Sequence, residues 1–151
     1  MKKILMILGG VFLTLVVIGA IGIAVISTKG NALDKESKKY VDRVAPIILS
    51  NLTKETLFKY SDAQLKASAK PEEFDKLFKM FSKLGRFKEY KESMGQAHIS
   101  ITNKGKSIYG KYVAKVDFET GPATLKITTV KKGSNWKIFN FHIDSMALLN
   151  Q

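Results

Sequence analysis

The chain has 151 residues, of which 45% are hydrophobic, no cysteine and a formal net charge of +12. The lack of cysteine excludes disulfides and a lipid-attachment cysteine, and a domain of about 120 residues can bury a core without them. Lysine supplies almost all of the positive charge, because Arg43 and Arg86 are the only arginines. Base and phosphate recognition favours the planar guanidinium, so we expect no nucleic-acid partner.

The first part of the chain is predicted to enter a membrane. An uncharged, mostly apolar run begins at Ile4 and ends at Ile26, and the next charged residue is Lys29. As a helix this run would be about 34 Å long, which is enough to cross a hydrocarbon core of roughly 30 Å. The run is longer than the apolar core of a secretory signal, so we expect an uncleaved anchor, with a cleaved signal as the alternative.

The predicted organisation is a membrane anchor over residues 1–29 and a folded domain over residues 30–151. Lys2 and Lys3 favour a cytoplasmic start, although the lysines that follow the run weaken this bias. We expect a single-pass protein of the inner membrane, with its C-terminal domain in the periplasm or outside the cell.

Helices are predicted in the first half of the domain. The first begins at Asn31, and Pro46 within it predicts a kink or a restart. A second helix is predicted over 53–60, followed by an irregular turn over 62–69. The apolar stripe of the first helix has a period near 3.6 and comprises Tyr40, Val41, Val44, Ile47, Ile48 and Leu52.

The clearest helix begins at Pro71, which suits the first helical turn, and Gly85 is a natural terminator. A face with many large side chains must cover a broad surface, which predicts packing against a sheet. The apolar face comprises Phe74, Leu77, Phe78, Phe81 and Leu84.

Four strands are predicted in the second half, over 97–102, 108–119, 123–127 and 136–143. The short connections between them predict an antiparallel meander. A change of period in the last segment predicts a bulge near Phe139 and Asn140. In the first segment the apolar positions are Ala97, Ile99 and Ile101, and they alternate with His98, Ser100 and Thr102.

Three stretches resemble the nuclear transport factor 2-like superfamily, which has the cystatin-like cone fold. They are YVDRVAPIILSNL at 40–52, KPEEFDKLFKMFSKLGRFKEY at 70–90 and GPATLKITTVKKGSNWKIFNFHIDS at 121–145. The resemblance covers roughly residues 35–145, and the look-alikes are small bacterial membrane-anchored proteins without an assigned activity. It implies an α+β domain in which about three helices pack on a curved four-stranded antiparallel sheet. Related cones commonly pair through the outer face of the sheet, which implies a possible homodimer.

Some relatives use a carboxylate or a His–Asp pair inside the cone, so the polar residues on the strands are candidates for such a site. His142 and Asp144 are two residues apart and therefore point to the same side of a strand, with Asn140 beside them if the bulge spares that stretch. This row is either a polar pocket floor or a solvated face. Tyr109 and Tyr112 face opposite sides, so at most one lines a cavity. The candidate pocket or polar-face residues are His98, Tyr112, Asp117, His142 and Asp144.

No phosphate-binding loop, nucleophile elbow or HExxH motif occurs in the chain, so we assign no catalytic residue and expect no cofactor. The two isolated histidines and the lack of cysteine make a zinc site improbable. The sequence favours a membrane-anchored, non-enzymatic module that binds a protein partner or a small ligand, or assists a membrane assembly. The alternatives are a small pocket enzyme of the isomerase or hydrolase type and a lysine-driven contact with anionic lipid or polymer.

Overall fold

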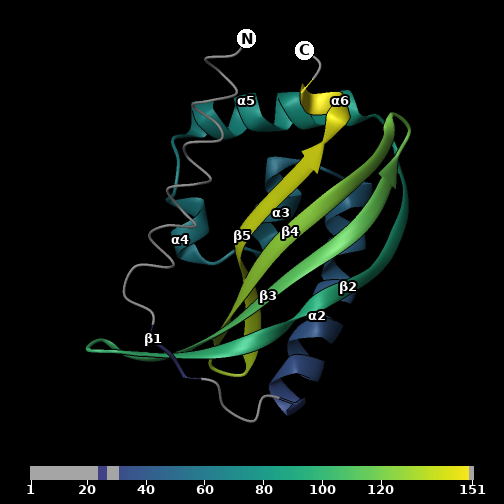
Figure 1. Ribbon diagram of the computed structural model, residues 1–151. Coiled ribbons are helices and arrows are strands. Elements are labelled where there is room, and N and C mark those ends of the chain that lie inside the picture. Colours follow the sequence, from purple (N-terminus) through teal and green to yellow (C-terminus); the bar gives the residue numbers. More distant parts are fainter. Residues whose placement is uncertain (1–23, 27–30, 150–151) are drawn as a thin grey trace.

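The computed structural model describes residues 24–26 and 31–149, and these form an α+β fold in which helices cover one face of an antiparallel sheet (Figure 1). The strands follow the order β1-β2-β3-β4-β5 in the sheet, so each long strand pairs with the next along the chain. The predicted meander of four long strands is therefore confirmed, with a short strand added at one edge.

The sequence order of the elements is helices first and long strands second. The helices are α2 (Asn31–Ser50), α3 (Lys54–Tyr60), α4 (Ala63–Lys66), α5 (Pro71–Phe81), the 3₁₀ helix η1 (Ser82–Leu84) and α6 (Met146–Leu149). The strands are β1 (Ala24–Ile26), β2 (Phe87–Thr102), β3 (Gly105–Phe118), β4 (Gly121–Lys132) and β5 (Asn135–Ser145).

Helix α2 continues through Pro46 without a restart. Proline removes one backbone donor from a helix, but the Pro46 carbonyl still accepts a hydrogen bond of 2.6 Å from the Ser50 hydroxyl. The placement of Ile47 on the apolar stripe is wrong, because its side chain is 46% exposed. Ala45 and Leu49 are buried in its place, so the stripe is rotated slightly around the helix.

Helices α3 and α4 begin at side-chain caps. The Thr53 hydroxyl accepts a hydrogen bond of 3.2 Å from the Thr56 backbone N–H, and an Asp62 carboxylate oxygen accepts one of 3.0 Å from Leu65 N–H. The second cap starts the one-turn helix α4 inside the segment predicted to be irregular. Helix α5 begins at Pro71 as predicted, and Gly85, with φ of +79°, follows η1.

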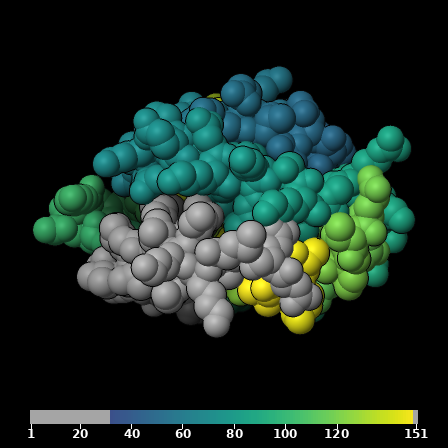
Figure 2. Space-filling model, turned by 90° about the horizontal axis from the view of Figure 1, so that it is seen from above, coloured from purple at the N-terminus to yellow at the C-terminus, as the bar shows by residue number. Residues whose placement is uncertain are grey.

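The inner face of the sheet, defined here as the face that packs on the helices, supplies most of the core. The helices form a continuous layer in blue to teal when the molecule is seen from above (Figure 2). Leu77 and Phe81 of α5 join this core, as predicted for the apolar face of that helix. The sheet residues in the core include Tyr112, Ala114, Val116, Phe118, Leu125, Ile127, Ile138, Phe141 and Ile143.

Strand β2 begins at Phe87, well before the predicted start at Ala97. Register shifts between Phe87 and Glu89 and between Tyr90 and Ser93 break the alternation of apolar and polar residues, which hid this part of the strand in the sequence. The predicted bulge in β5 is confirmed, because Thr128 pairs with Asn140 while Thr129 pairs with Ile138.

The burial pattern predicted for residues 97–102 is wrong at two positions. Ser100 is 1% exposed, whereas Ile101 is 49% exposed. In the sheet, Ser100 is paired with Val25 of β1 on one side and with Ser107 of β3 on the other. The small side chain of Ser100 is therefore covered, because a strand lies on each side of it. Ile101 is exposed because it lies close to the open end of the β2–β3 hairpin.

The end of the apolar run differs from its predicted helix. Ala24–Ile26 forms β1 and pairs antiparallel with Ile99–Ile101 of β2. The residues of this segment include Val25 and Ile26, which favour strands, and the open edge of β2 supplies unpaired backbone groups. Residues 4–23 of the predicted anchor lie outside the described residues. In the part of the chain that the structure describes, no helix is both long and apolar enough to cross a membrane.

Candidate functional site

The polar candidates on the strands lie on the outer face of the sheet, opposite the helices. His142 and Asp144 alternate with the buried residues Phe141 and Ile143 on β5, and their side chains form a hydrogen bond of 2.6 Å. The register of β4 and β5 is regular from Asn140 to Asp144, so Asn140 shares their face, as predicted for a bulge that spares this stretch. The predicted row of polar side chains therefore exists, and it faces away from the core.

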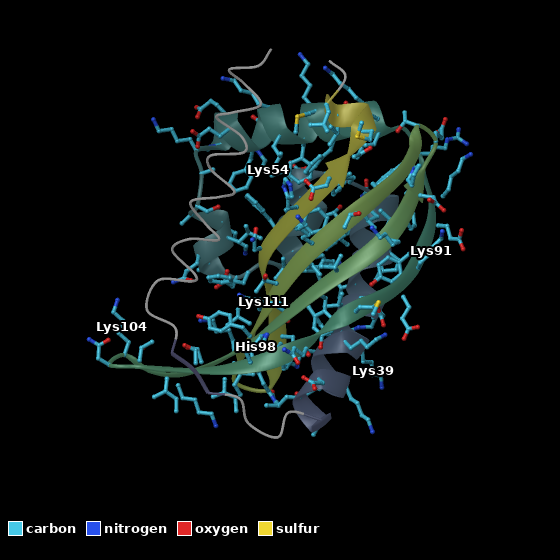
Figure 3. The ribbon with its side chains drawn as sticks, viewed as in Figure 1. Lys39, Lys54, Lys91, His98, Lys104 and Lys111 are labelled. Carbon is cyan, nitrogen blue, oxygen red and sulfur yellow. The ribbon has the colours of Figure 1, made fainter. Side chains whose placement is uncertain are left out.

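Two other candidates lie apart from this pair. His98 of β2 is paired with Tyr109 in the sheet (Figure 3), whereas Asp117 is paired with Glu89. Tyr109 and Asp117 are separated by eight residues of β3, which is about 27 Å in an extended strand. The Asp117 carboxylate instead lies 3.6 Å from the Lys91 ammonium. His98 and Asp117 thus form no common site.

The electrostatics of Asp144 are those of a half-exposed ion pair. Its side chain is 48% exposed, and its carboxylate lies 2.9 Å from the Lys126 ammonium. Burial raises the pKa of Asp144, but Lys126 and His142 lower it further than burial raises it, so the net shift is downward. A carboxylate held in its charged form next to a lysine accepts protons poorly, which weakens this pair as a general base.

Tyr112, a candidate for a pocket or a polar face, has its side chain buried on the inner face of the sheet. Its hydroxyl forms a hydrogen bond of 2.5 Å with the Ser37 hydroxyl and donates one of 2.9 Å to the Asp34 carbonyl. Both partners belong to α2, so Tyr112 joins this helix to the sheet. Tyr109 lies on the other side of β3, and its ring packs edge-on against Phe139 at 5.2 Å.

Two carboxylates attach the N-terminal two thirds of α2 to β2. An Asp34 oxygen accepts a hydrogen bond of 2.6 Å from the Ala97 backbone N–H. One Asp42 oxygen accepts hydrogen bonds from the Tyr90 hydroxyl at 2.7 Å and from the Ser93 hydroxyl at 2.7 Å. The Asp42 contacts lie at the register shift between Tyr90 and Ser93, whereas Ala97 lies in the regular part of β2.

A cleft of about 520 Å³ lies between α2 and the turn that joins β4 to β5. This volume is in the range of small-ligand sites in proteins. Its walls combine aromatic rings with cationic side chains. The lining residues are Glu36, Lys39, Tyr40, Arg43, Tyr60, Ser134, Asn135, Trp136 and Lys137.

The aromatic rings of the cleft are held in place by the core and by one hydrogen bond. Tyr40 is buried, and its hydroxyl donates a hydrogen bond of 3.3 Å to the Tyr60 carbonyl. Burial raises the pKa of Tyr40 to about 12, so its hydroxyl stays protonated at neutral pH. The Arg43 guanidinium lies 5.7 Å from the centre of the Tyr40 ring, a cation–π contact that orients the arginine.

The single carboxylate in the cleft lining is already neutralised. The Glu36 carboxylate lies 2.8 Å from the Lys131 ammonium, and the hydrogen bond from this lysine holds the pKa of Glu36 below its ordinary value. Lys131 also lies over the Trp136 ring, with its ammonium 5.8 Å from the ring centre. Within the described part of the chain, Lys39, Arg43 and Lys137 form no ion pair.

Trp136 contributes a buried ring to the wall of the cleft. Its side chain is only 7% exposed, and its indole Nε1–H is inaccessible to solvent and meets the geometric limits of a hydrogen bond with no described residue. The N–H is nevertheless close enough to the Glu36 carboxyl to help lower its pKa. A ligand in the cleft would therefore contact the ring of Trp136, while the N–H interacts with Glu36.

The sequence reasoning missed this cleft, although it assigned Tyr40 and Trp136 to apolar positions. One signal was present, because Arg43 is one of two arginines and follows Tyr40 by three residues, on the same side of a helix. Among residues 24–26 and 31–149, no three histidine or carboxylate side chains group as metal ligands. Comparisons with protein-family models, curated proteins and solved structures found no match for this chain.

Proposed function

We propose that this protein is a membrane-tethered, non-enzymatic binding module, and that its ligand occupies the cleft between α2 and the β4–β5 turn. The observation that carries the proposal is the combination of three aromatic rings and three cations outside ion pairs around one cleft of about 520 Å³. The aromatic walls offer apolar contact area, and the cations offer orientation. No histidine is among the described residues that line the cleft, and Glu36, the one carboxylate among them, is neutralised by Lys131, which favours binding over proton transfer at this site.

The membrane tether remains part of this proposal. Residues 4–23, which precede β1, are uncharged, and as a helix they would be about 30 Å long. We further propose, from the sequence resemblance, that the folded domain is a nuclear transport factor 2-like cone. We also propose that this domain lies outside the cytoplasm. Membrane fractionation of the full chain tests the tether, and a reporter fused after Gln151 tests the orientation. Mature protein that begins after Ser27 and leaves the membrane fraction would contradict the tether.

Binding in the cleft has a built-in reporter, because Trp136 is the only tryptophan of the chain. A panel of small aromatic compounds, neutral, cationic and anionic, is titrated against the full chain in non-ionic detergent while tryptophan emission is recorded. We expect at least one class to give a saturable change. Ser134→Phe, which places a ring at the edge of the cleft, should weaken it.

A matched control for this variant is Asn103→Phe, which adds the same ring to the turn between β2 and β3. This control should bind as the unmodified chain does. Equal binding by Ser134→Phe and Asn103→Phe would place the ligand elsewhere, and an emission that no class of compound changes would argue against the cleft as a binding site.

A pocket enzyme of the isomerase or hydrolase type is the second candidate, and one observation favours it. The hydrogen bond of 2.6 Å between His142 and Asp144 is a geometry used in proton transfer. The pair lies on the outer face, away from the cleft. A substrate turned over by the full chain, with turnover lost in both His142→Ala and Asp144→Asn, would establish the enzyme and refute the binding module.

A further inference from the structure

The cleft lies at the end of the domain through which the chain enters it. In an antiparallel meander, the β2–β3 and β4–β5 turns lie at the same end of the sheet, and Ser134 and Asn135 of the second turn line the cleft. Strand β1 pairs with β2 next to the first of these turns (Figure 1). A membrane-spanning helix that ends just before Ala24 would therefore place this end of the sheet beside the bilayer.

The charge at this end is positive. Lys39, Arg43 and Lys137 line the cleft, and the carboxylate of Glu36 is neutralised by Lys131. Figure 3 shows Lys104 at the tip of the β2–β3 hairpin, so the same end carries a cation outside the cleft as well. An anion that enters the cleft meets several cations and no unneutralised carboxylate among the lining residues.

Arg43 gives this charge a direction. The contact with the Tyr40 ring orients the guanidinium, and its planar fork can form two parallel hydrogen bonds with a carboxylate or a phosphate. Tyr60 and Trp136 also line the cleft and add aromatic walls to it. An anionic group in the cleft would accept from the Arg43 fork, which neither a cation nor an apolar ligand could do.

We propose that the cleft recognises the anionic group of its ligand, a carboxylate or a phosphate, through Arg43, with Lys39 and Lys137 adding charge. This inference rests on the proposed binding function and names the ligand chemistry of the same site. The anion can come from a soluble molecule or from the headgroup of an anionic lipid, because the cleft opens at the end of the domain next to the proposed anchor.

Two probes of equal shape separate charge from aromatic contact. Benzoate and benzamide are titrated against the full chain in non-ionic detergent, with Trp136 emission as the signal. We expect saturable binding of benzoate that weakens with added salt and with inorganic phosphate as a competitor, and at least tenfold weaker binding of benzamide. Arg43→Gln should weaken benzoate binding by about tenfold, since it removes a charge-assisted hydrogen bond.

The matched control is Lys79→Gln, which removes one positive charge from α5, outside the cleft. It should bind benzoate as the unmodified chain does. Equal binding of benzoate and benzamide, together with unchanged binding by Arg43→Gln, would overturn the anion proposal and leave the binding cleft in place. A chain that binds none of the neutral, cationic or anionic compounds would overturn the proposed function itself.

The source of the anion is tested in vesicles. The full chain is reconstituted into phosphatidylcholine vesicles with or without phosphatidylglycerol, and Trp136 emission and benzoate binding are measured. A headgroup ligand predicts that phosphatidylglycerol changes the emission and competes with benzoate, and that Arg43→Gln removes both effects. A soluble ligand predicts the same emission and the same benzoate binding in both kinds of vesicle.

Discussion

Helices α5 and α2 cover the same face of the sheet by different means. Helix α5 contributes buried apolar side chains such as Leu77 and Phe81 to the core. Helix α2 also buries apolar residues, but Asp34 and Asp42 in its N-terminal two thirds accept hydrogen bonds from donors on β2. Apolar packing is not directional, whereas hydrogen bonds fix both the position and the rotation of a helix.

This difference explains where the cleft lies. Asp42 is followed directly by Arg43, so the contacts that fix Asp42 against β2 also fix the direction in which Arg43 leaves the helix. The same part of α2 carries Tyr40, whose ring orients the guanidinium. The part of α2 that is hydrogen-bonded to β2 therefore sets the geometry of the binding site, while α5 supplies stability.

The largest effect is expected from Phe81→Ala in α5. Phe81 is 1% exposed, and truncation of such a ring leaves a cavity that costs about 3–5 kcal/mol of unfolding free energy. Thermal unfolding of the full chain in non-ionic detergent measures it. Phe139→Ala removes a ring from the outer face and should cost clearly less. Equal losses in the two variants would mean that α5 is not the main source of stability.

Asp42→Asn should have the next largest effect, about 1.5–3 kcal/mol, because it removes the charge from a partly buried network of hydrogen bonds. The amide would also turn an N–H group toward the Lys38 ammonium, which donates to the Asp42 carboxylate at 2.7 Å. Asp75→Asn is the control, since Asp75 is exposed and pairs only with Lys54. A loss for Asp42→Asn no greater than for Asp75→Asn would show that the polar contacts of α2 add little.

The stability that Asp42 contributes should depend on pH. Burial raises the pKa of Asp42, but hydrogen bonds from Lys38, Ser93 and Tyr90 outweigh burial and lower the pKa below its ordinary value. A carboxyl with a lowered pKa in the folded state contributes its full stability above the unfolded pKa of about 4, and loses it as the pH falls through the folded value. Unfolding from pH 7 to pH 2 should show the difference between the unmodified chain and Asp42→Asn shrinking below about pH 4. A constant difference would contradict this assignment.

Tyr112→Phe should cost about 1 kcal/mol, because it leaves the Ser37 hydroxyl and the Asp34 carbonyl without their partner on β3. The change keeps the ring and its packing, so it isolates the hydrogen bonds between α2 and the sheet. Unfolding by urea at neutral pH measures the loss. Tyr109→Phe, on the outer face, is the control and should be nearly neutral, and a neutral Tyr112→Phe would contradict the role given to the hydroxyl.

Asp144→Asn should have the smallest effect, within about 0.5 kcal/mol, because its ion pair with Lys126 is half exposed and therefore screened by water. It should also leave ligand binding in the cleft unchanged. Calorimetric unfolding and the benzoate titration check the two statements. A large loss of stability or of benzoate binding would show that the outer face of the sheet contributes what is assigned to the core and the cleft.

The elements that the sequence predicted well carry their own local signals. Pro71, the apolar face of α5 and Gly85 define one helix without any tertiary contact, and the changed period around Phe139 indicates the bulge directly. The start of β2 was missed because two register shifts place charged residues such as Lys88 and Glu89 out of alternation. Local periodicity cannot reveal a strand whose irregularity is compensated by a distant helix.

The cleft could not be predicted for a related reason. Its two key side chains, Arg43 and Trp136, belong to the first helix and the last strand, and only the packing of α2 on the sheet brings them to one cleft. The sequence instead singled out His142 and Asp144, which are close in the chain, as a row that is either a pocket floor or a solvated face. The structure places this row on the outer face of the sheet.

The most direct test of the cleft is the nuclear magnetic resonance signal of the Trp136 indole N–H, which is unique in this chain. The full chain, labelled with ¹⁵N in detergent micelles, is titrated with benzoate. Binding in the cleft predicts a saturable shift of the indole proton, as expected for a ligand beside the Trp136 ring, with the same midpoint in Asp144→Asn and a higher midpoint in Arg43→Gln. An indole signal that stays fixed while the signals of His142 and Asp144 move would contradict the account.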